Sequence, residues 1–224
     1  MKTYGVILAA GESTRFDAKV NKLFYKVKDK ELVLYPVETF LYNNEIDEVL
    51  VVSSKSNDSE LKKLLTEHQS VSIVLGGDSR QESEYCALQH LQNKATDNCL
   101  IVIHDAARSF ISSDLLTNLV NTAKENGSAA PYLDNSKFYD KENDEFVINK
   151  KIVDIQTPQV YKYKELFECY SFLSKNKITG MVDTTESMFN FNRFETHVIK
   201  GEDINLKITY KSDLEIIEKA IIQK

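Results

Sequence analysis

The chain has 224 residues, 42% of them hydrophobic, and its net charge is −6 because 34 acidic residues outnumber 28 Lys and Arg. That apolar content can bury a sizeable core, which excludes a wholly disordered chain, and the length fits one domain. The acidic balance argues against binding nucleic acid by bulk positive charge, and no apolar run approaches the roughly 20 residues of a membrane helix. We therefore expect a folded protein that binds neither nucleic acid nor membrane.

Cysteine and histidine usage argues against disulfides and zinc. The three cysteines, Cys86, Cys99 and Cys169, show no CxxC or metal-ligand spacing, so we interpret them as small buried side chains. The four histidines are not spaced from a cysteine or from one another as a zinc site requires. The absence of a disulfide framework fits a reducing cytoplasm, where we expect the protein to act.

Strands and helices alternate through the first 127 residues. Continuous apolar runs, typical of strands covered on both faces, occupy residues 5–9, 48–52, 71–75 and 99–103. Helical spacing lies between and after them, over residues 32–43, 60–68, 81–93 and 113–126. The last helix is capped by Ser112 or Ser113 and ends at Gly127. The alternation predicts an α/β fold with a mainly parallel sheet flanked by helices.

The rest of the chain departs from this alternation. Residues 131–155 are rich in turn residues, and short apolar runs over 146–148 and 152–155 flank Asn149-Lys150-Lys151. We predict that residues from about 134 to 155 form a β-hairpin arm that projects from the sheet. A helix over 164–173, a loop through 180–183, strands over 196–199 and 206–209 and a helix over 212–222 complete a single domain, residues 1–224.

Two glycine-containing turns follow predicted strands and are candidates for binding a nucleotide. The first strand runs into Ala9-Ala10-Gly11, with Arg15 and Lys22 beyond, so backbone N–H groups and two cations could meet a polyphosphate. The third strand runs into Gly76-Gly77-Asp78, where glycine lets the backbone approach a base or sugar, and Ser83 would face the same crevice. Neither turn is a P-loop or a GxGxxG motif, so a plain turn remains the alternative for each.

Two charged residues near later strand ends are also candidates. Asp105 follows the fourth strand, where a carboxylate can hold a divalent cation that bridges phosphates, whereas His104 is better interpreted as a structural hydrogen-bonding residue. Lys207 lies in an otherwise apolar predicted strand, a costly position unless its ammonium meets an anion; the alternative is a residue that faces solvent. No G-x-S-x-G motif or Cys/His pairing suggests acyl transfer.

The order and spacing of these motifs along the chain are more specific than any one of them. They are Leu8-Ala9-Ala10-Gly11, Arg15, Lys22, Gly76-Gly77, Arg80-Gln81, Ser83, His104-Asp105-Ala106-Ala107-Arg108, Gln156-Thr157-Pro158-Gln159, Asp183 and Lys207-Ile208-Thr209. In this arrangement the sequence resembles the 2-C-methyl-D-erythritol 4-phosphate cytidylyltransferase family over nearly its whole length. The related ribitol-5-phosphate cytidylyltransferases more often have Ala-Val-Arg after the aspartate and Arg-Asn before the following helix.

The resemblance implies a Rossmann-like sheet, a homodimer formed through the arm, and Mg²⁺-dependent transfer of CMP from CTP to 2-C-methyl-D-erythritol 4-phosphate in isoprenoid precursor synthesis. The residues implied as catalytic, around the α-phosphate, are Arg15, Lys22 and Lys207. Those implied to bind CTP are Ala9, Ala10, Gly11, Gly77, Asp78, Ser83 and Asp105, of which Asp105 would also hold the metal. Those implied to bind the polyol phosphate are Arg108, Asp134, Asn135, Lys150, Lys151 and Asp183.

Three positions depart from the family pattern. Where the family has Thr after Asp134, and an Arg eight residues before Thr157, this chain has Asn135 and Asn149, with Lys150 and Lys151 as the nearest cations. Ser13 stands where many relatives have a second glycine. The acceptor-side departures leave ribitol 5-phosphate or another polyol phosphate as an alternative acceptor. A nucleotide-binding scaffold without catalysis is the alternative from a different class.

Overall fold

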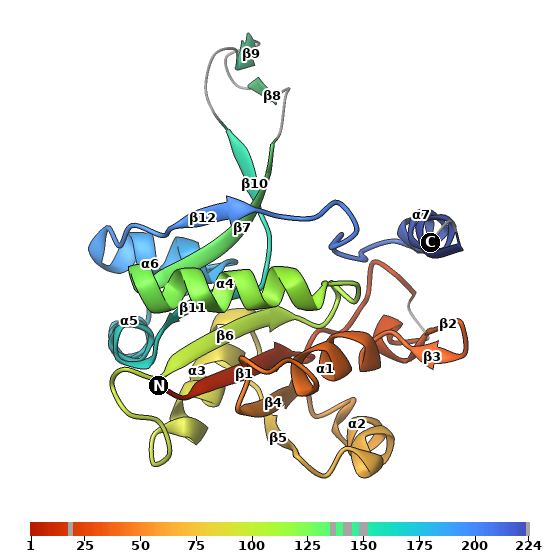
Figure 1. Cartoon of the computed structure of the whole chain (residues 1–224), viewed down its shortest axis with the longest axis horizontal. Coiled ribbons are helices and arrows are strands. Elements are labelled where there is room, and N and C mark those ends of the chain that lie inside the picture. Colours follow the sequence, from red (N-terminus) through yellow and green to blue (C-terminus); the bar gives the residue numbers. More distant parts are fainter. Residues whose placement is uncertain (18–19, 135–137, 141–144, 148–151, 223–224) are drawn as a thin grey trace.

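The computed structural model describes residues 1–222 except 18–19, 135–137, 141–144 and 148–151. Its core is an eight-stranded sheet with the order β10-β7-β11-β6-β1-β4-β5, and β12 pairs with β7 (Figure 1). The strands are β1 (Thr3–Leu8), β4 (Glu48–Ser53), β5 (Val71–Leu75), β6 (Leu100–Asp105), β7 (Ser128–Asp134), β10 (Val153–Ile155), β11 (Gln159–Lys162) and β12 (Val198–Lys200). β5, β4, β1 and β6 are parallel, and β11 is antiparallel to both of its neighbours. The predicted α/β class is confirmed.

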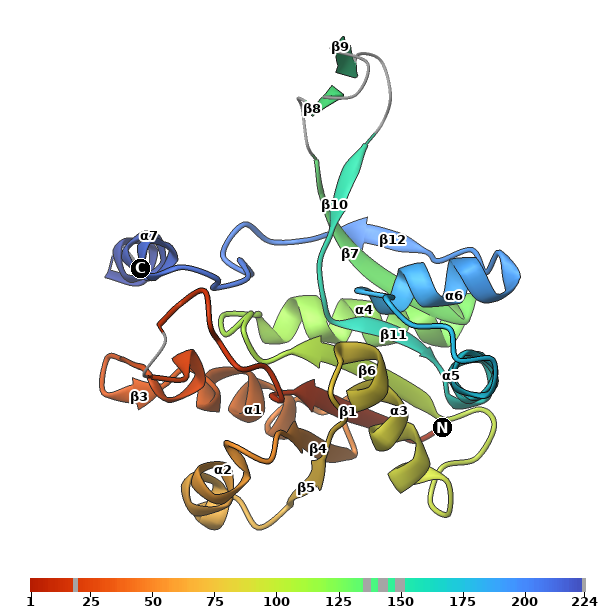
Figure 2. The ribbon, with the colours of Figure 1, turned by 180° about the vertical axis from the view of Figure 1, so that it is seen from behind.

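Helices cover both faces of the sheet (Figures 1 and 2). α1 (Leu34–Leu41), α2 (Asp58–Leu64) and α4 (Ser113–Asn126) bury side chains such as Phe40 and Leu119 against one face. α3 (Arg80–Leu91), α5 (Tyr163–Lys175) and α6 (Thr184–Asn192) bury side chains such as Leu88 and Tyr170 against the other. Because successive strand residues point to opposite faces, Val51 belongs to the first cluster and its neighbour Val52 to the second.

The chain's last helix, α7 (Lys211–Ile222), packs on the segment that follows β1 and not on the sheet. A small cluster joins its Leu214 and Ile217 to Ile208, Phe16 and Val27. That segment also contains the 3₁₀ turn η1 (Lys22–Phe24) and the hairpin β2 (Lys26–Val27) and β3 (Lys30–Glu31); a second 3₁₀ turn, η2 (Leu65–Glu67), follows α2. The packing brings two ends of the chain together beside the strand ends.

The arm projects from the sheet, but its strand pairing differs from the prediction. β10 pairs with β7, and the short strands β8 (Phe138–Asp140) and β9 (Glu145–Val147) pair with each other farther out (Figure 1). The sequence predicted that the runs 146–148 and 152–155 would flank one turn, which is wrong because each has another partner. The alternation in those runs is too short to select a register. Asn135, Asn149, Lys150 and Lys151 lie outside the described residues.

Two other expectations need correction. The segment 206–209 is not a strand, although the backbone N–H of Ile208 donates to the carbonyl of Ala107 at 2.8 Å. The loop predicted through residues 180–183 is followed directly by α6, a helix that the sequence analysis missed. Its start is marked by Asp183, whose carboxylate accepts from the N–H groups of Thr185 and Glu186.

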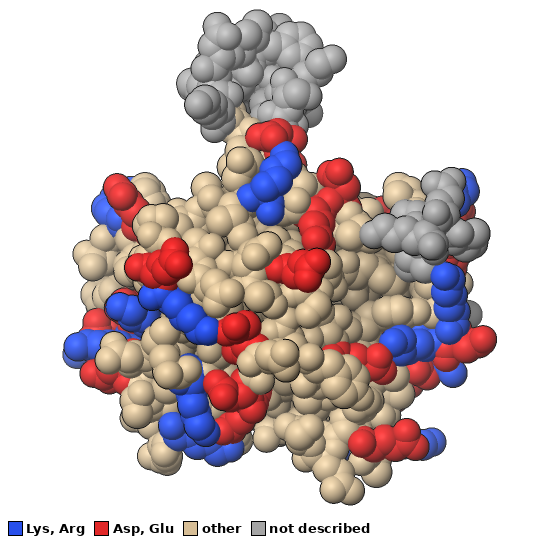
Figure 3. Space-filling view, viewed as in Figure 1, with Lys and Arg blue, Asp and Glu red and all other residues tan. Residues whose placement is uncertain are grey.

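The described helices and the charges on one face bear on membrane and nucleic-acid binding. Within the described residues no helix is both long and apolar enough to cross a bilayer. On the face drawn in Figure 3, acidic and basic side chains are intermixed among uncharged residues. This side of the molecule therefore lacks, within its described part, the extended basic patch typical of nucleic-acid binding.

Candidate active site

A cleft of about 370 Å³ opens at the carboxyl ends of β1, β5 and β6. Parallel sheets bind ligands at this edge because the strand ends and the following loops converge there. The cleft is lined by all ten residues assigned from the sequence to the α-phosphate and the CTP: Ala9, Ala10, Gly11, Arg15, Lys22, Gly77, Asp78, Ser83, Asp105 and Lys207. Residues from both ends of the chain thus meet in one site.

The loop after β1 is held by Asn21. Its side-chain amide donates to the carbonyl of Gly11 at 3.1 Å, and its carbonyl oxygen accepts from the hydroxyl of Ser13 at 2.9 Å. Ser13 has a φ of +57°, a conformation that glycine adopts more easily. The position where many relatives have glycine is therefore one where the backbone is left-handed. The N–H and carbonyl of Ala9 already bond to Val52 and Asn57, so a nucleotide contact by Ala9 would have to share them.

The paired glycines after β5 are required by packing against α3. A Cβ on Gly76 would lie 2.5 Å from the Ser83 hydroxyl oxygen, and one on Gly77 would lie 2.4 Å from the Cβ of Glu82. The Ser79 side chain caps α3 by accepting from the N–H of Glu82 at 3.1 Å. The close approach places Ser83, which is buried, at the cleft beside Gly77.

Four cations line the cleft: Arg15 and Lys22 from the segment after β1, Arg80 from the start of α3, and Lys207 from the segment before α7. Lys22 donates to the carbonyl of Ile208 at 2.6 Å, and Lys207 pairs with Asp105 at 2.6 Å. Burial, followed by repulsion from Lys207, lowers the pKa of Lys22 from 10.5 to about 8. Each ammonium has three donors, so both lysines keep donors that can turn toward an anion. Lys207, which the sequence analysis expected to meet an anion, pairs with Asp105. Its segment, residues 206–209, lies outside the sheet.

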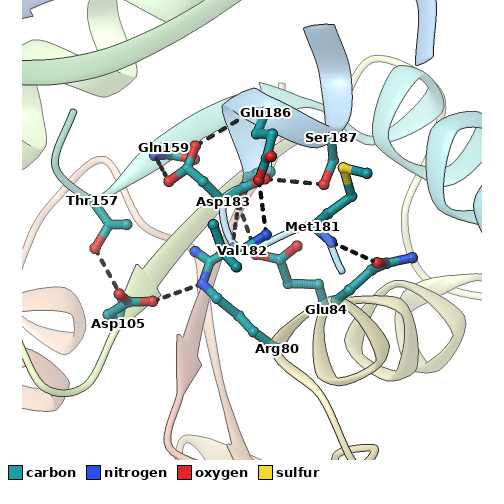
Figure 4. A network of polar contacts seen from close by, with 12 residues as sticks. Arg80, Glu84, Asp105, Thr157, Gln159, Met181, Val182, Asp183, Glu186 and Ser187 are labelled. Atoms are coloured by element: carbon teal, nitrogen blue, oxygen red, sulfur yellow. Dashed lines mark hydrogen bonds and ion pairs between the residues drawn. The ribbon is translucent and has the colours of Figure 1, made fainter. Parts of the chain in front are cut away.

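Asp105 is a buried carboxylate that lines the cleft. Its Oδ1 accepts from Arg80 Nε at 3.1 Å, and its backbone N–H donates to the Thr157 hydroxyl at 3.0 Å (Figure 4). Burial alone would raise the pKa of Asp105, but Arg80 and Lys207 outweigh it and hold that pKa well below the usual range. Asp105 is therefore ionised at any ordinary pH.

The cleft could hold Mg²⁺ if substrate phosphates supply further ligands and Lys207 leaves Asp105. Mg²⁺ is commonly held by one or two carboxylates together with substrate phosphates and water. Asp105 supplies such a carboxylate, and Glu12 and Asp78 also line the cleft. No group of three or more His, Cys, Asp or Glu is placed to hold a metal without other ligands, as far as the described residues go. Because Lys207 occupies Oδ2 of Asp105, the lysine would have to turn away for a metal to bind that oxygen.

Behind Asp105 lies a buried network that the sequence analysis did not assign to the site. Arg80 Nη1 pairs with Glu84 at 2.5 Å, and the Thr184 hydroxyl donates to the same Glu84 oxygen at 2.7 Å. Figure 4 shows Arg80 between Asp105 on one side and Glu84 on the other. Burial raises the pKa of Glu84 to about 7, in spite of Arg80 and Thr184, which lower it. The sequence signal was the Arg80–Glu84 spacing of four residues.

His104 has the structural role expected of it. Its Nε2–H donates to the carbonyl of Arg108 at 2.9 Å, so its Nδ1 accepts from the Thr157 hydroxyl at 3.0 Å. Burial lowers the pKa of His104 to about 4, which keeps the ring neutral. The Thr157 hydroxyl thereby links His104 to the backbone of Asp105 and fixes the end of β6.

The residues predicted for the acceptor side are more dispersed. Arg108 donates to the carbonyl of Asn205 at 3.0 Å, and its Nε is buried without a partner among the described residues. Asp183 caps α6 and accepts from Gln159 at 2.7 Å. Asp134 is exposed on the arm in an ion pair with Lys200. None of these three lines the cleft, and the sites of Asn135, Lys150 and Lys151 lie outside the described residues.

A mainly parallel sheet whose strand ends gather four cations and the buried carboxylate of Asp105 around one cleft suits an enzyme that binds a nucleotide polyphosphate. The model of the IspD family, 2-C-methyl-D-erythritol 4-phosphate cytidylyltransferase, matches residues 4–224. The chain belongs to this family of cytidylyltransferases.

Individual relatives agree with the family match. The cytidylyltransferase of Clostridium tetani is 30% identical over 228 residues, which cover 98% of this chain and 90% of that protein. The bifunctional enzyme IspD/IspF of Pelagibacter ubique is 33% identical over 217 residues; they cover 96% of this chain, which thus spans only 56% of that relative. The crystal structure of 4-diphosphocytidyl-2C-methyl-D-erythritol synthase from Anaerococcus prevotii superposes with a TM-score of 0.84 at 22% identity, covering 100% of this chain and 96% of that one. This last likeness supports the fold.

Proposed function

We propose that the chain transfers CMP from CTP to 2-C-methyl-D-erythritol 4-phosphate, giving 4-diphosphocytidyl-2-C-methyl-D-erythritol and pyrophosphate for isoprenoid precursor synthesis. The observation that carries the proposal is the family match over residues 4–224, joined to a single cleft that contains all ten residues assigned to CTP and its α-phosphate. Three free cysteines are compatible with a cytoplasmic location.

The chemical step asks the protein for positioning and charge. A phosphate oxygen of the acceptor attacks the α-phosphorus in line, the bond to the bridging oxygen breaks, and pyrophosphate leaves with that electron pair. Lys22 and Lys207, with Arg15, would stabilise the negative charge on the α-phosphate. Lys22 bonds to the Ile208 carbonyl and Lys207 to Asp105, so both ammonium groups already lie at the cleft, and Lys207 would have to leave Oδ2 of Asp105 where a metal binds that oxygen.

Nucleotide selection would come from the two glycine-containing turns. The backbone of Ala10 and Gly11 would contact the phosphates, and Ala9 would contribute mainly through its fixed position. The backbone at Gly77 and Asp78, with the Ser83 hydroxyl, would bind the cytosine, and the size of the pocket there would select against a purine. Mg²⁺ held by Asp105 would neutralise the phosphates and orient pyrophosphate as the leaving group.

The acceptor would bind on the side of Arg108 and Asp183, and we propose that the arm of a second subunit completes the site. Asp134 and Asn135, with Lys150 and Lys151, would then contact the polyol phosphate from the partner in a homodimer. The position of the arm, which projects from the sheet at β7 and β10, supports this arrangement (Figure 1).

Pyrophosphate release tests the proposal directly. The enzyme is assayed with CTP and Mg²⁺ and either 2-C-methyl-D-erythritol 4-phosphate or ribitol 5-phosphate, and the first acceptor should give the larger kcat/KM. CTP with Mg²⁺ should also raise the melting temperature far more than ATP or GTP. Turnover only with ribitol 5-phosphate would move the acceptor assignment, and CTP binding without turnover of any acceptor would indicate a scaffold without catalysis.

A further inference from the structure

The most unusual feature outside the described cleft is the carboxylate of Glu84. Glu84, on α3, is 0% exposed, so ionising its carboxyl group there costs free energy of folding. One oxygen binds Arg80 and the Thr184 hydroxyl, while its Oε2 and the Nη2 of Arg80 are buried without a partner among the described residues. Groups that destabilise a fold in this way are concentrated at functional sites.

Glu84 lies at the junction between the two halves of the proposed active site. Through Arg80 it is connected to Asp105, since the same guanidinium holds Glu84 by Nη1 and Asp105 by Nε. Through Thr184 it is connected to the first turn of α6, next to Asp183 on the acceptor side. The network in Figure 4 therefore spans from the nucleotide cleft to the start of α6.

We propose that Glu84 is a positioning residue that fixes the Arg80 guanidinium, so that Arg80 holds Asp105 in the orientation required for transfer. A guanidinium is a planar fork, and anchoring one of its ends determines where the other end points. Without that anchor Arg80 could pair with Asp105 in more than one way, and Oδ2 of Asp105 would not be presented consistently to Lys207 or to a metal. The inference rests on the proposed function.

The charge state of Glu84 matters to this role. The ionised form makes the stronger hydrogen bond to Arg80, and burial brings the pKa of Glu84 to about 7, within the working range of pH. The ionisable and polar groups that face it come from each neighbouring element: Arg80 of α3, Asp105 of β6, Tyr161 of β11, Cys169 of α5, and Asp183 and Thr184 at α6.

The first test compares Glu84→Gln with Glu168→Gln, the same change at an exposed position of α5. Pyrophosphate release at pH 8 with CTP, 2-C-methyl-D-erythritol 4-phosphate and Mg²⁺ should show kcat about tenfold or more lower for Glu84→Gln, with KM for CTP nearly unchanged. Glu168→Gln should behave as wild type. A kcat for Glu84→Gln within twofold of wild type overturns the inference.

A double-variant cycle tests whether Glu84 acts through Arg80. Arg80→Lys keeps the charge but removes the fork, so adding Glu84→Gln to it should cost no further activity. If the loss of activity in the double variant equals the product of the two single losses, Glu84 acts independently of Arg80. The pH profile gives a second readout: wild-type kcat should rise through about pH 7, and Glu84→Gln should lack that rise. A profile unchanged by the substitution contradicts the role of the ionised form.

Stability separates positioning from a structural role. Since a neutral amide is cheaper to bury than a carboxylate, Glu84→Gln should melt at or above the wild-type temperature at pH 8. Loss of folding in step with kcat would overturn the inference. Thr184→Val, which removes only the hydroxyl that holds Glu84, should give a smaller loss of kcat, about threefold, and wild-type kcat in this variant counts against the network. If wild type itself shows no turnover, the proposed function fails and the variants are not the cause.

Discussion

The positive charge of Lys22 is expected to destabilise the folded protein, although the proposed reaction requires that charge. Its ammonium is partly buried near Lys207 and Arg15, and the pKa falls from 10.5 to about 8 because burial and these cations disfavour the charged form. Lys22→Met keeps most of the aliphatic stem and removes the charge. We therefore expect this variant to be inactive and more stable than wild type near neutral pH.

The size of the gain follows from the pKa change. A fall from 10.5 to about 8 corresponds to on the order of 3 kcal/mol of free energy of folding as an upper bound. Lys22 is only half-buried, so screening by solvent reduces that figure, and the hydrogen bond to Ile208, worth about 1 kcal/mol, is lost. A net gain of about 1–2 kcal/mol remains, or roughly 2–8 °C in Tm for a chain of this length.

The pH dependence of the difference has a definite sign. Below pH 8 the lysine is charged in both folded and unfolded protein, so wild type bears the whole cost of burying it. Between about pH 8 and 10.5 the folded protein releases the proton before the unfolded chain does, so wild type gains stability as pH rises. Above 10.5 both states are neutral and the cost is gone. The advantage of Lys22→Met should accordingly be full at pH 7 and small at pH 10.

Thermal melting of wild type, Lys22→Met and the exposed control Lys63→Met at pH 7 and pH 10 checks this reasoning. Adding CTP and Mg²⁺ should raise the Tm of wild type and of the control, and much less that of Lys22→Met. A Lys22→Met protein that melts below wild type at pH 7, or a Tm difference independent of pH, would refute the argument. A lower Tm at pH 7 would mean that the hydrogen bond to Ile208 outweighs the cost of the buried charge.

Three further predictions concern the same cleft and the arm. Lys207→Ala should lower kcat about 10²–10³-fold without unfolding the protein, and near-normal turnover would exclude it as an α-phosphate stabiliser. Gly11→Ala, whose Cβ would meet nothing within 4 Å, should raise KM for CTP at unchanged Tm, whereas Gly77→Ala, which clashes at 2.4 Å, should lower Tm. A Tm loss in Gly11→Ala would instead show a structural need for that glycine. The double change Lys150→Ala/Lys151→Ala should raise KM for the polyol phosphate roughly tenfold or more, with KM for CTP nearly unchanged; an unaltered acceptor KM would remove these lysines from the site.

Residues at strand ends could be assigned from the sequence because the signal is local. A buried strand, the turn that follows it and the cap of the next helix lie within a few residues, as at Gly76-Gly77 and Ser79. The helix over 113–126 was predicted with its correct bounds for the same reason: Ser112 caps it and Gly127, at φ +84°, ends it. Once the strands are parallel, their carboxyl ends must share an edge, which places Gly11, Gly77 and Asp105 together.

Elements that depend on distant partners were predicted less well. Residues 206–209 have strand-like composition, but the segment crosses the strand ends, where Lys207 meets Asp105 and Ile208 packs with α7. α6 was missed although Asp183 and Glu186 form a cap, because Val182-Asp183-Thr184-Thr185 has weak helical propensity. Packing against α5 selects the helix, and that contact is not encoded in the local pattern.

The Arg80–Glu84 pair shows where sequence reasoning reaches a physical limit. Four residues apart on a helix, Arg and Glu commonly form a solvated pair worth a few tenths of a kcal/mol. The same spacing acquires the opposite meaning when α3 packs against α5 and Thr184 at the start of α6 meets Glu84, because Glu84 is then fully buried and its pKa rises to about 7. Nothing within α3 distinguishes the two cases. The distinction comes from Thr184, 100 residues away, whose hydroxyl replaces the water that an exposed glutamate would have kept.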